Sequence, residues 1–290
     1  MEQVTPLPGD VEGWRVGTTE FVQFFDHGGS TSERFTIQKN QAIIDLYVAL
    51  CPQVQQGRIV ELGVADGGST ALLALLTSPT KLVACEFSPT PLPALAAFIE
   101  RHGLTDQVRP YFATDQGNRT ALQQIVEDEF GAAPLDLVVD DASHVYDKTL
   151  ASFEVLFPRL RPGGTFVIED WATQYIVAQA IVEAQADPAS AAYATVRAQY
   201  EAALRIGAPP RPPLARLAIE LFLVSIRAPE VVAAVTMNHH WLTVQRGPAP
   251  LEHPSFRLAD WYLDHFGWFD GDDDPSRWWL HRLWERAGSA

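Results

Sequence analysis

The sequence has few basic residues, few cysteines and no long hydrophobic run. Its 21 Lys and Arg stand against 36 Asp and Glu, and the net charge of −15 argues against nucleic acid or an anionic membrane as partner. Cys51 and Cys85 are too few for a disulfide framework and suit a reducing cytoplasm. The longest apolar run, 214–226, is too short to span a bilayer, and the first residues do not resemble a signal peptide. We therefore expect a soluble, cytoplasmic protein.

Short apolar segments alternate with amphipathic ones through the middle of the chain. This order is typical of βαβ units, with a mostly parallel sheet and helices on both of its faces. Two further strands are linked so closely that they must pair antiparallel. The sequence therefore predicts an α/β fold with a Rossmann-like, seven-stranded, mostly parallel sheet and a terminal antiparallel hairpin. The expected strands are 58–63, 81–86, 108–113, 135–140, 165–169, 231–237 and 241–245, and the helices between the first five are 69–78, 91–103, 117–129 and 148–160.

Three regions are expected along the chain. Residues 1–54 comprise an irregular arm over 1–36 and an amphipathic helix over 38–52. Residues 55–247 form the core, with a helical insertion at about 172–228. Residues 248–290 form a Trp-rich appendage, which packs on the domain or on a second subunit of a homo-oligomer. The helices expected within the insertion are 172–185, 189–204 and 213–227.

Two acidic clusters follow expected strands. Asp140 and Asp141 come after one strand, His144 stands three residues further on, and Glu169 and Asp170 close the next strand. Neighbouring strands lie about 4.8 Å apart, so this much negative charge requires a cation or protonation. A hard divalent metal is the simplest answer. The alternative is that these acids cap the following helices.

A glycine-rich loop follows the first strand of the expected parallel sheet. Gly63, Gly67 and Gly68 depart from the G-x-G-x-x-G spacing of dinucleotide sites, and Glu61 suits an ammonium group better than a pyrophosphate. The loop resembles motif I of S-adenosylmethionine-dependent methyltransferases, although an ordinary strand–turn–helix loop is the alternative. At the ends of the next strands, a carboxylate can accept both ribose hydroxyls and polar groups can face adenine. The candidate cofactor-binding residues are Glu61, Gly63, Gly67, Ser69, Glu86, Asp115, Gln116 and Asp140.

Over about residues 57–171 the sequence closely resembles the metal-dependent O-methyltransferases of macrolide sugars, the macrocin and mycinamicin type, which are related to cephalosporin-hydroxylase-like proteins. The segments that carry the resemblance are Val139-Asp140-Asp141-Ala142-Ser143-His144, Ser152-Phe153-Glu154-Val155-Leu156-Phe157-Pro158, Pro162-Gly163-Gly164 and Val167-Ile168-Glu169-Asp170.

The resemblance implies that Asp141, Glu169 and Asp170 serve a magnesium ion and that His144 is the general base. Manganese suits the same oxygen-rich site. Ala142 replaces a glycine common in the family. Lys148 replaces a common histidine, which puts in doubt any contact made from that helix turn.

We therefore expect transfer of a methyl group from S-adenosylmethionine to a hydroxyl of a small molecule, a glycoside or another natural product. The alternatives are a hydroxylase-like relative of the same fold, a non-catalytic ligand-binding module and a nicotinamide dehydrogenase. Three further side chains are candidates for contact with the acceptor. They are Trp171, which can equally be a core residue, and His239 and His240, which are more simply turn residues.

Overall fold

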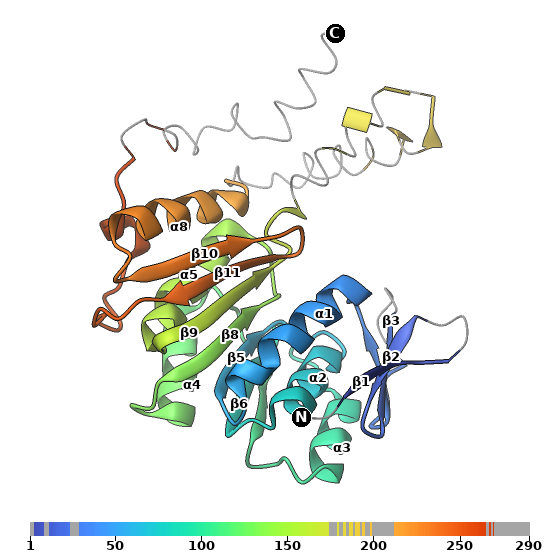
Figure 1. Ribbon diagram of the computed structural model, residues 1–290. Coiled ribbons are helices and arrows are strands. Elements are labelled where there is room, and N and C mark those ends of the chain that lie inside the picture. The colour runs from blue at the N-terminus through green and yellow to red at the C-terminus, as the bar shows by residue number, and fades with distance from the viewer. Residues whose placement is uncertain are drawn as a thin grey trace.

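The computed structural model describes residues 3–8, 12–23, 29–173 and 212–264, with scattered positions between 179 and 198 and at 267 and 269. Within these residues a seven-stranded sheet forms the centre and a four-stranded sheet lies beside it (Figure 1). The larger sheet has the strand order β10-β11-β9-β8-β5-β6-β7. The five neighbouring strands β5 to β9 run parallel to one another. Strand β11 runs antiparallel to both β9 and β10. The expected α/β fold is therefore confirmed.

The element bounds lie within a few residues of those expected, except that β9 begins earlier and α5 ends at the turn before Pro158. The strands of the large sheet are β5 (Arg58–Leu62), β6 (Lys81–Cys85), β7 (Val108–Tyr111), β8 (Leu135–Asp140), β9 (Leu160–Glu169), β10 (Val232–Met237) and β11 (Trp241–Arg246). The helices are α1 (Gln41–Leu50), α2 (Gly68–Thr77), α3 (Pro93–Arg101), α4 (Arg119–Phe130), α5 (Tyr146–Leu156) and α8 (Ala215–Arg227), with 3-10 turns η1 (Cys51–Val54), η2 (Phe157–Arg159) and η3 (Leu258–Trp261).

Helices cover both faces of the large sheet and create two hydrophobic cores (Figure 1). Successive residues of one strand pack alternately into the two hydrophobic cores. In β9, Phe166 and Ile168 pack toward α4, α5 and α8, whereas Val167 packs toward α1, α2 and α3. By the same alternation Glu169, the last residue of β9, points to the side of α1. This alternation places the carboxylate of Glu169 on the face of the sheet that α1 covers.

The N-terminal residues differ from the expected irregular arm. They form a four-stranded sheet, and β2 and β3 are joined by a two-residue turn at Gly17-Thr18, with Gly17 at φ 57°. Such turns favour glycine because they require positive φ. The expectation of an irregular arm is wrong, because the alternation of the buried residues Trp14, Val16 and Phe21 extends over too few positions to mark strands in the sequence. The strands are β1 (Val4–Pro6), β2 (Gly13–Val16), β3 (Thr19–Gln23) and β4 (Arg34–Ile37).

Parts of the expected helical insertion and the appendage cannot be compared with the structure. The helices expected over 172–185 and 189–204 and the chain beyond residue 269 lie mostly outside the described residues, whereas the helix expected over 213–227 is α8. The boundaries at 54 and 247 stay a prediction. Within the described part of the chain, no helix has both the length and the apolar character that a membrane span needs.

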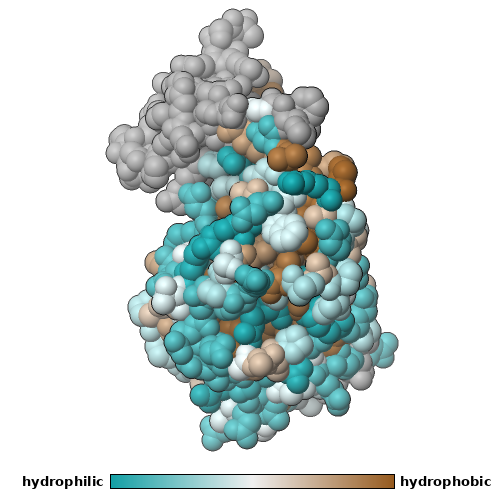
Figure 2. Space-filling view, turned by 90° about the vertical axis from the view of Figure 1, so that its left-hand side faces the viewer, coloured by the Kyte–Doolittle hydropathy of each residue, from teal (hydrophilic) through white to brown (hydrophobic). Residues whose placement is uncertain are grey.

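Helix α8 exposes hydrophobic side chains at the surface of the protein. Figure 2 shows a largely hydrophilic face with hydrophobic side chains gathered in its upper part. Ile219, Phe222 and Ile226 lie three and four positions apart on α8 and are 39%, 51% and 65% exposed. Helix α8 therefore keeps an apolar stripe on its outer side.

Candidate active site

A cavity of about 570 Å³ lies at the carboxyl ends of the parallel strands. Open α/β sheets bind ligands at this edge, because the loops that leave the strands diverge there. Residues 36–39, which lead from β4 into α1, contribute a further part of the wall, so the N-terminal sheet delivers a segment to the site. The expected site residues in the wall are Gly63, Ser69, Glu86, Asp115, Gln116, Asp141, His144 and Asp170.

The glycine loop after β5 needs its glycines. Gly63 has φ +88°, and a Cβ atom there would lie 2.1 Å from the carbonyl oxygen of Asp141. Gly67 is the left-handed N-cap of α2, with φ +89°. No other residue adopts these conformations without strain. The loop therefore passes directly beside the acidic segment after β8.

Glu86 holds the glycine loop in place. Its Oε2 accepts hydrogen bonds from the backbone N–H groups of Val64 at 3.0 Å and Ala65 at 3.1 Å, and its Oε1 accepts from Ser88 N at 2.8 Å. These bonds use three of the roughly four acceptor positions of a carboxylate. Glu86 lines the cavity. Its carboxylate can accept hydrogen bonds from both ribose hydroxyls of a cofactor only if one of these three backbone bonds is given up.

Asp115 and Lys148 form an ion pair at another part of the wall. The Lys148 ammonium lies 2.9 Å from Asp115 Oδ2 and 5.3 Å from the ring centre of Phe87, which is 70% exposed. The hydrogen bond from Lys148, with a second from Gly117 N, lowers the pKa of Asp115 below its usual value. Lys148 thus joins the ends of β6 and β7 to α5.

Two of the expected cofactor-binding carboxylates lie behind the wall. Glu61 and Asp140 are each 1% exposed and do not line the cavity. Thr70 donates to Glu61, while Gln116 Nε2 and Ser152 Oγ donate to Asp140. Burial raises the pKa of Glu61 to about 7 and that of Asp140 to about 6, against these hydrogen bonds. Both are strand residues, so their side chains are held between the sheet and its helices.

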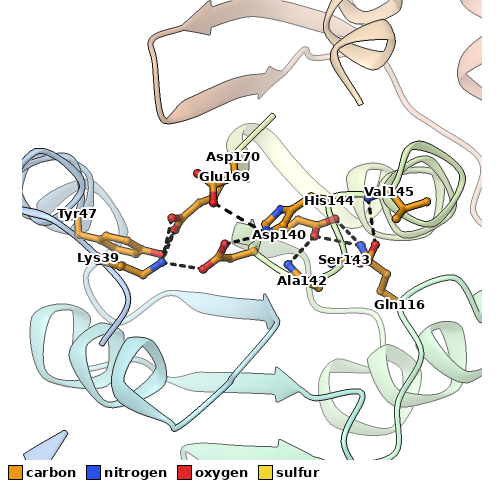
Figure 3. Close-up of polar contacts among 11 residues, drawn as sticks. Lys39, Tyr47, Gln116, Asp140, Ala142, Ser143, His144, Val145, Glu169 and Asp170 are labelled. Carbon is orange, nitrogen blue, oxygen red and sulfur yellow. Dashed lines mark hydrogen bonds and ion pairs between the residues drawn. The ribbon is translucent and has the colours of Figure 1, made fainter. Parts of the chain in front are cut away.

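Three residues that can bind a metal converge at the cavity. Ligand atoms of Asp141, His144 and Asp170 all lie within 4.8 Å of one another. His144 Nε2 is 3.9 Å from Asp141 Oδ1 and 4.0 Å from Asp170 Oδ2 (Figure 3). Magnesium at about 2.1 Å from octahedral ligands would set them roughly 3 to 4 Å apart, so the cluster fits after a small contraction.

The backbone at this cluster adopts an uncommon conformation. His144 has φ 51° and Asp170 has φ 52°, both in the left-handed region. Residues other than glycine rarely adopt it, although Asp and His are among the more tolerant, and such strain gathers at functional sites. The two turns bring their side chains toward Asp141 from separate strands.

Glu169, the third expected metal ligand, is not with these residues. It is 2% exposed, is absent from the cavity wall, and receives hydrogen bonds from the Lys39 ammonium and the Tyr47 hydroxyl (Figure 3). Burial and the charge of Asp141 raise its pKa, while Lys39 opposes them. The sequence analysis did not predict Lys39 as a site residue. The negative charge of the acidic clusters predicted that a cation lies nearby, but it did not indicate which one.

The hairpin tip adjoins the cluster. The backbone N–H of Asp170 donates to His240 O at 2.9 Å, and Trp171 Nε1 donates to Asn238 O at 2.9 Å. Burial and the neighbouring His239 lower the pKa of His240. The β10–β11 turn therefore fixes the backbone at Asp170, and Trp171 ties the same turn to β9.

Comparison with known proteins gives matches to the central part of the chain. A family model described as "Methyltransferase domain" matches residues 60–171. Demethylmacrocin O-methyltransferase from Streptomyces fradiae is 52% identical over 42 residues, 14% of this chain and 11% of that protein. Mycinamicin VI 2''-O-methyltransferase from Micromonospora griseorubida is 44% identical over 61 residues, 21% of this chain and 14% of that protein.

A solved structure shares the fold. The MycE methyltransferase from the mycinamycin biosynthetic pathway, in complex with Mg, SAH and mycinamycin VI, aligns with 76% of this chain and 53% of its own, at 20% identity and a TM-score of 0.51. The chain thus spans about half of that protein and less than a sixth of the curated relatives' length. Residues 60–171 thus match the methyltransferase-domain model, and parts of the chain are similar in sequence to demethylmacrocin O-methyltransferase and mycinamicin VI 2''-O-methyltransferase.

Proposed function

We propose that the protein is an S-adenosylmethionine-dependent, magnesium-assisted O-methyltransferase that acts on a sugar hydroxyl of a natural product, with His144 as general base. The observation that carries this proposal is the convergence of Asp141, His144 and Asp170 beside the Gly63 loop in one cavity. The relatives named above methylate hydroxyls of glycosylated natural products, which supports the choice of acceptor class.

The chain supplies both a cofactor region and a reaction region. The Gly63 loop, Glu86 and Asp115 line one part of the cavity, where S-adenosylmethionine would lie. Asp141 and Asp170 would hold the metal ion, since two carboxylates with open positions suit magnesium or manganese. A bound divalent ion supplies positive charge that stabilises a developing alkoxide.

His144 is placed to receive the proton. The acceptor oxygen forms a bond to the methyl carbon, the carbon–sulfur bond breaks, and its electron pair remains on sulfur as a thioether. The hydroxyl proton passes to the imidazole, so atoms and charge balance. Only a neutral imidazole can accept this proton, and general-base catalysis of this kind contributes roughly 10²- to 10⁴-fold in rate.

The chemistry of the cluster disfavours the hydroxylase-like alternative. Non-haem iron oxygenases use two histidines and one carboxylate, whereas the cluster found among the described residues has one histidine and two carboxylates. A dehydrogenase is disfavoured by the spacing of the glycines and by the antiparallel β10–β11 pair that ends the sheet.

Calorimetric titration of the protein with S-adenosylhomocysteine tests the cofactor assignment. We expect a dissociation constant in the micromolar range. Demethylated sugar glycosides then serve as acceptors, with magnesium and with chelator, and formation of S-adenosylhomocysteine is measured. Transfer should need the metal ion. No binding heat and no thermal shift at millimolar ligand would overturn the proposed function.

A further inference from the structure

A lysine lies at the centre of the acidic cluster. The Lys39 ammonium is 2.8 Å from Asp141 Oδ2 and 2.9 Å from each carboxylate oxygen of Glu169, and the side chain is 3% exposed (Figure 3). The residue stands between β4 and Asn40, which is the N-cap of α1. A cation from the N-terminal region therefore reaches two carboxylates that come from β9 and from the loop after β8.

These contacts use most of the hydrogen-bonding capacity of Glu169. Each of its oxygens accepts from Lys39, and Oε1 accepts also from the hydroxyl of Tyr47 in α1. The ammonium lies 5.3 Å from the Tyr47 ring centre, so the ring and the hydroxyl surround the ion pair together. Glu169 is buried, lies outside the cavity wall, and uses three of its roughly four acceptor positions on the side of α1.

Asp141 is shared between the lysine and the cavity. Its Oδ2 accepts from Lys39, while its Oδ1 lies on the side of His144, 3.9 Å from Nε2. A carboxylate held by a fixed cation on one oxygen has a single oxygen left with a set direction. Lys39 therefore engages Oδ2 of Asp141, and Oδ1 is the oxygen on the side of His144.

We propose that Lys39 is a positioning residue that occupies the inner half of the acidic cluster as a permanent cation and confines the divalent metal ion to Asp141 Oδ1, Asp170 and the side of His144. Glu169 is then a counter-ion for Lys39 and not a metal ligand. This inference rests on the proposed function only in that it concerns the same metal ion. It makes this chain differ from the ligand set that the family resemblance implies.

Manganese binding, measured without cofactor or acceptor, tests the role directly. The informative variant is Lys39→Met together with Glu169→Gln, because it removes the ion pair without changing the net charge and leaves an amide that accepts from Tyr47. Calorimetry and the electron paramagnetic resonance signal of free Mn²⁺ both report the affinity. We expect the double variant to bind within about threefold of wild type, and Asp170→Asn to bind at least about tenfold more weakly.

The single variant Lys39→Met gives a second, opposite signature. It removes a positive charge beside the ion and releases Glu169, so we expect Mn²⁺ to bind about tenfold more tightly. Damage to the fold would not tighten binding. If Lys39→Met does not fold, the double variant still decides the question.

The outcomes separate the two proposals. If wild type binds Mn²⁺ and the double variant loses affinity as Asp170→Asn does, Glu169 is a ligand and the role of Lys39 is overturned while the methyltransferase assignment stands. Failure of Lys39→Met to bind more tightly in a folded protein would also contradict it. Absence of Mn²⁺ binding by wild type that binds S-adenosylhomocysteine would remove the metal from the proposed function and this inference with it.

Discussion

Replacement of Glu61 by glutamine should make the protein more stable at alkaline pH. Glu61 is the next-to-last residue of β5 and is 1% exposed, and burial raises its pKa from 4.5 to about 7 against the hydrogen bonds from Ser69 and Thr70 of α2. The folded protein therefore binds this proton more tightly than the unfolded chain. The contribution of Glu61 to the stability of the wild type must fall as the pH rises between these two values, because the unfolded chain releases this proton at a lower pH than the folded protein does.

The pKa difference sets the size of the effect. Each pH unit of difference is worth about 1.4 kcal/mol, and at pH 5 part of the unfolded population is already ionised, so Glu61 removes about 2.5 kcal/mol of unfolding free energy between pH 5 and pH 8. Glutamine has no charge to bury. Its carbonyl can accept from Thr70, and any cost of the amide group is the same at both pH values. The difference between the two pH values therefore isolates the ionisation.

Urea unfolding of both proteins, in chelator and without cofactor, measures this difference. We expect the stability of Glu61→Gln relative to wild type to rise by about 2.5 kcal/mol from pH 5 to pH 8, or roughly 5 to 10 °C in Tm. Glu100→Gln removes an exposed carboxylate from α3 and is the matched control, for which the curves should coincide. An identical effect of Glu61→Gln at both pH values would refute the reasoning, since Glu61 would then be ionised in the folded protein at no cost.

Three further predictions follow from the site. His144→Gln should lower kcat by roughly 10²- to 10⁴-fold with unchanged affinity for S-adenosylhomocysteine; stopped assays and calorimetry check it, and a retained kcat would exclude His144 as base. Asp115→Asn should weaken S-adenosylhomocysteine binding about tenfold by calorimetry, because the carboxylate at the cavity wall loses its charge; equal affinity would place Asp115 outside the cofactor contacts. Gly63→Ala should destabilise by about 3 kcal/mol or more in urea, since its Cβ would lie 2.1 Å from a backbone oxygen, whereas Gly103→Ala, with φ +64° and nothing within 4 Å, should cost only about 1 kcal/mol; similar losses would contradict the close approach.

The order of strands and helices could be read from the sequence. Apolar runs such as 137–139 and 82–85 lack polar alternation because both faces of a parallel sheet are covered, and that pattern is local. The position of the acids after the strands was equally local. Because parallel strands end at one edge, the meeting of Asp141 and Asp170 followed without knowledge of the tertiary structure.

Which carboxylate faces the cavity was beyond the sequence. Glu61, Asp140 and Glu169 are the last or next-to-last residues of their strands and stay between the sheet and its helices, whereas Asp141 and Asp170 are the first residues beyond and reach the cavity. One residue separates the two environments. Strand ends cannot be located to one residue from apolar patterning, because the last ladder bond depends on the neighbouring strand.

The sequence by itself determined that this chain folds as an α/β sheet with a glycine loop and acidic strand ends, because these signals lie within a few residues of one another. The tertiary structure alone decided that Lys39 neutralises Glu169, 130 residues away, and that Tyr47 completes the pair. Nothing in the local sequence marks Lys39, which stands before a helix like many solvated lysines. Its burial arises from the packing of the N-terminal sheet and α1 against the large sheet, and such long-range contacts exist only once the chain has folded.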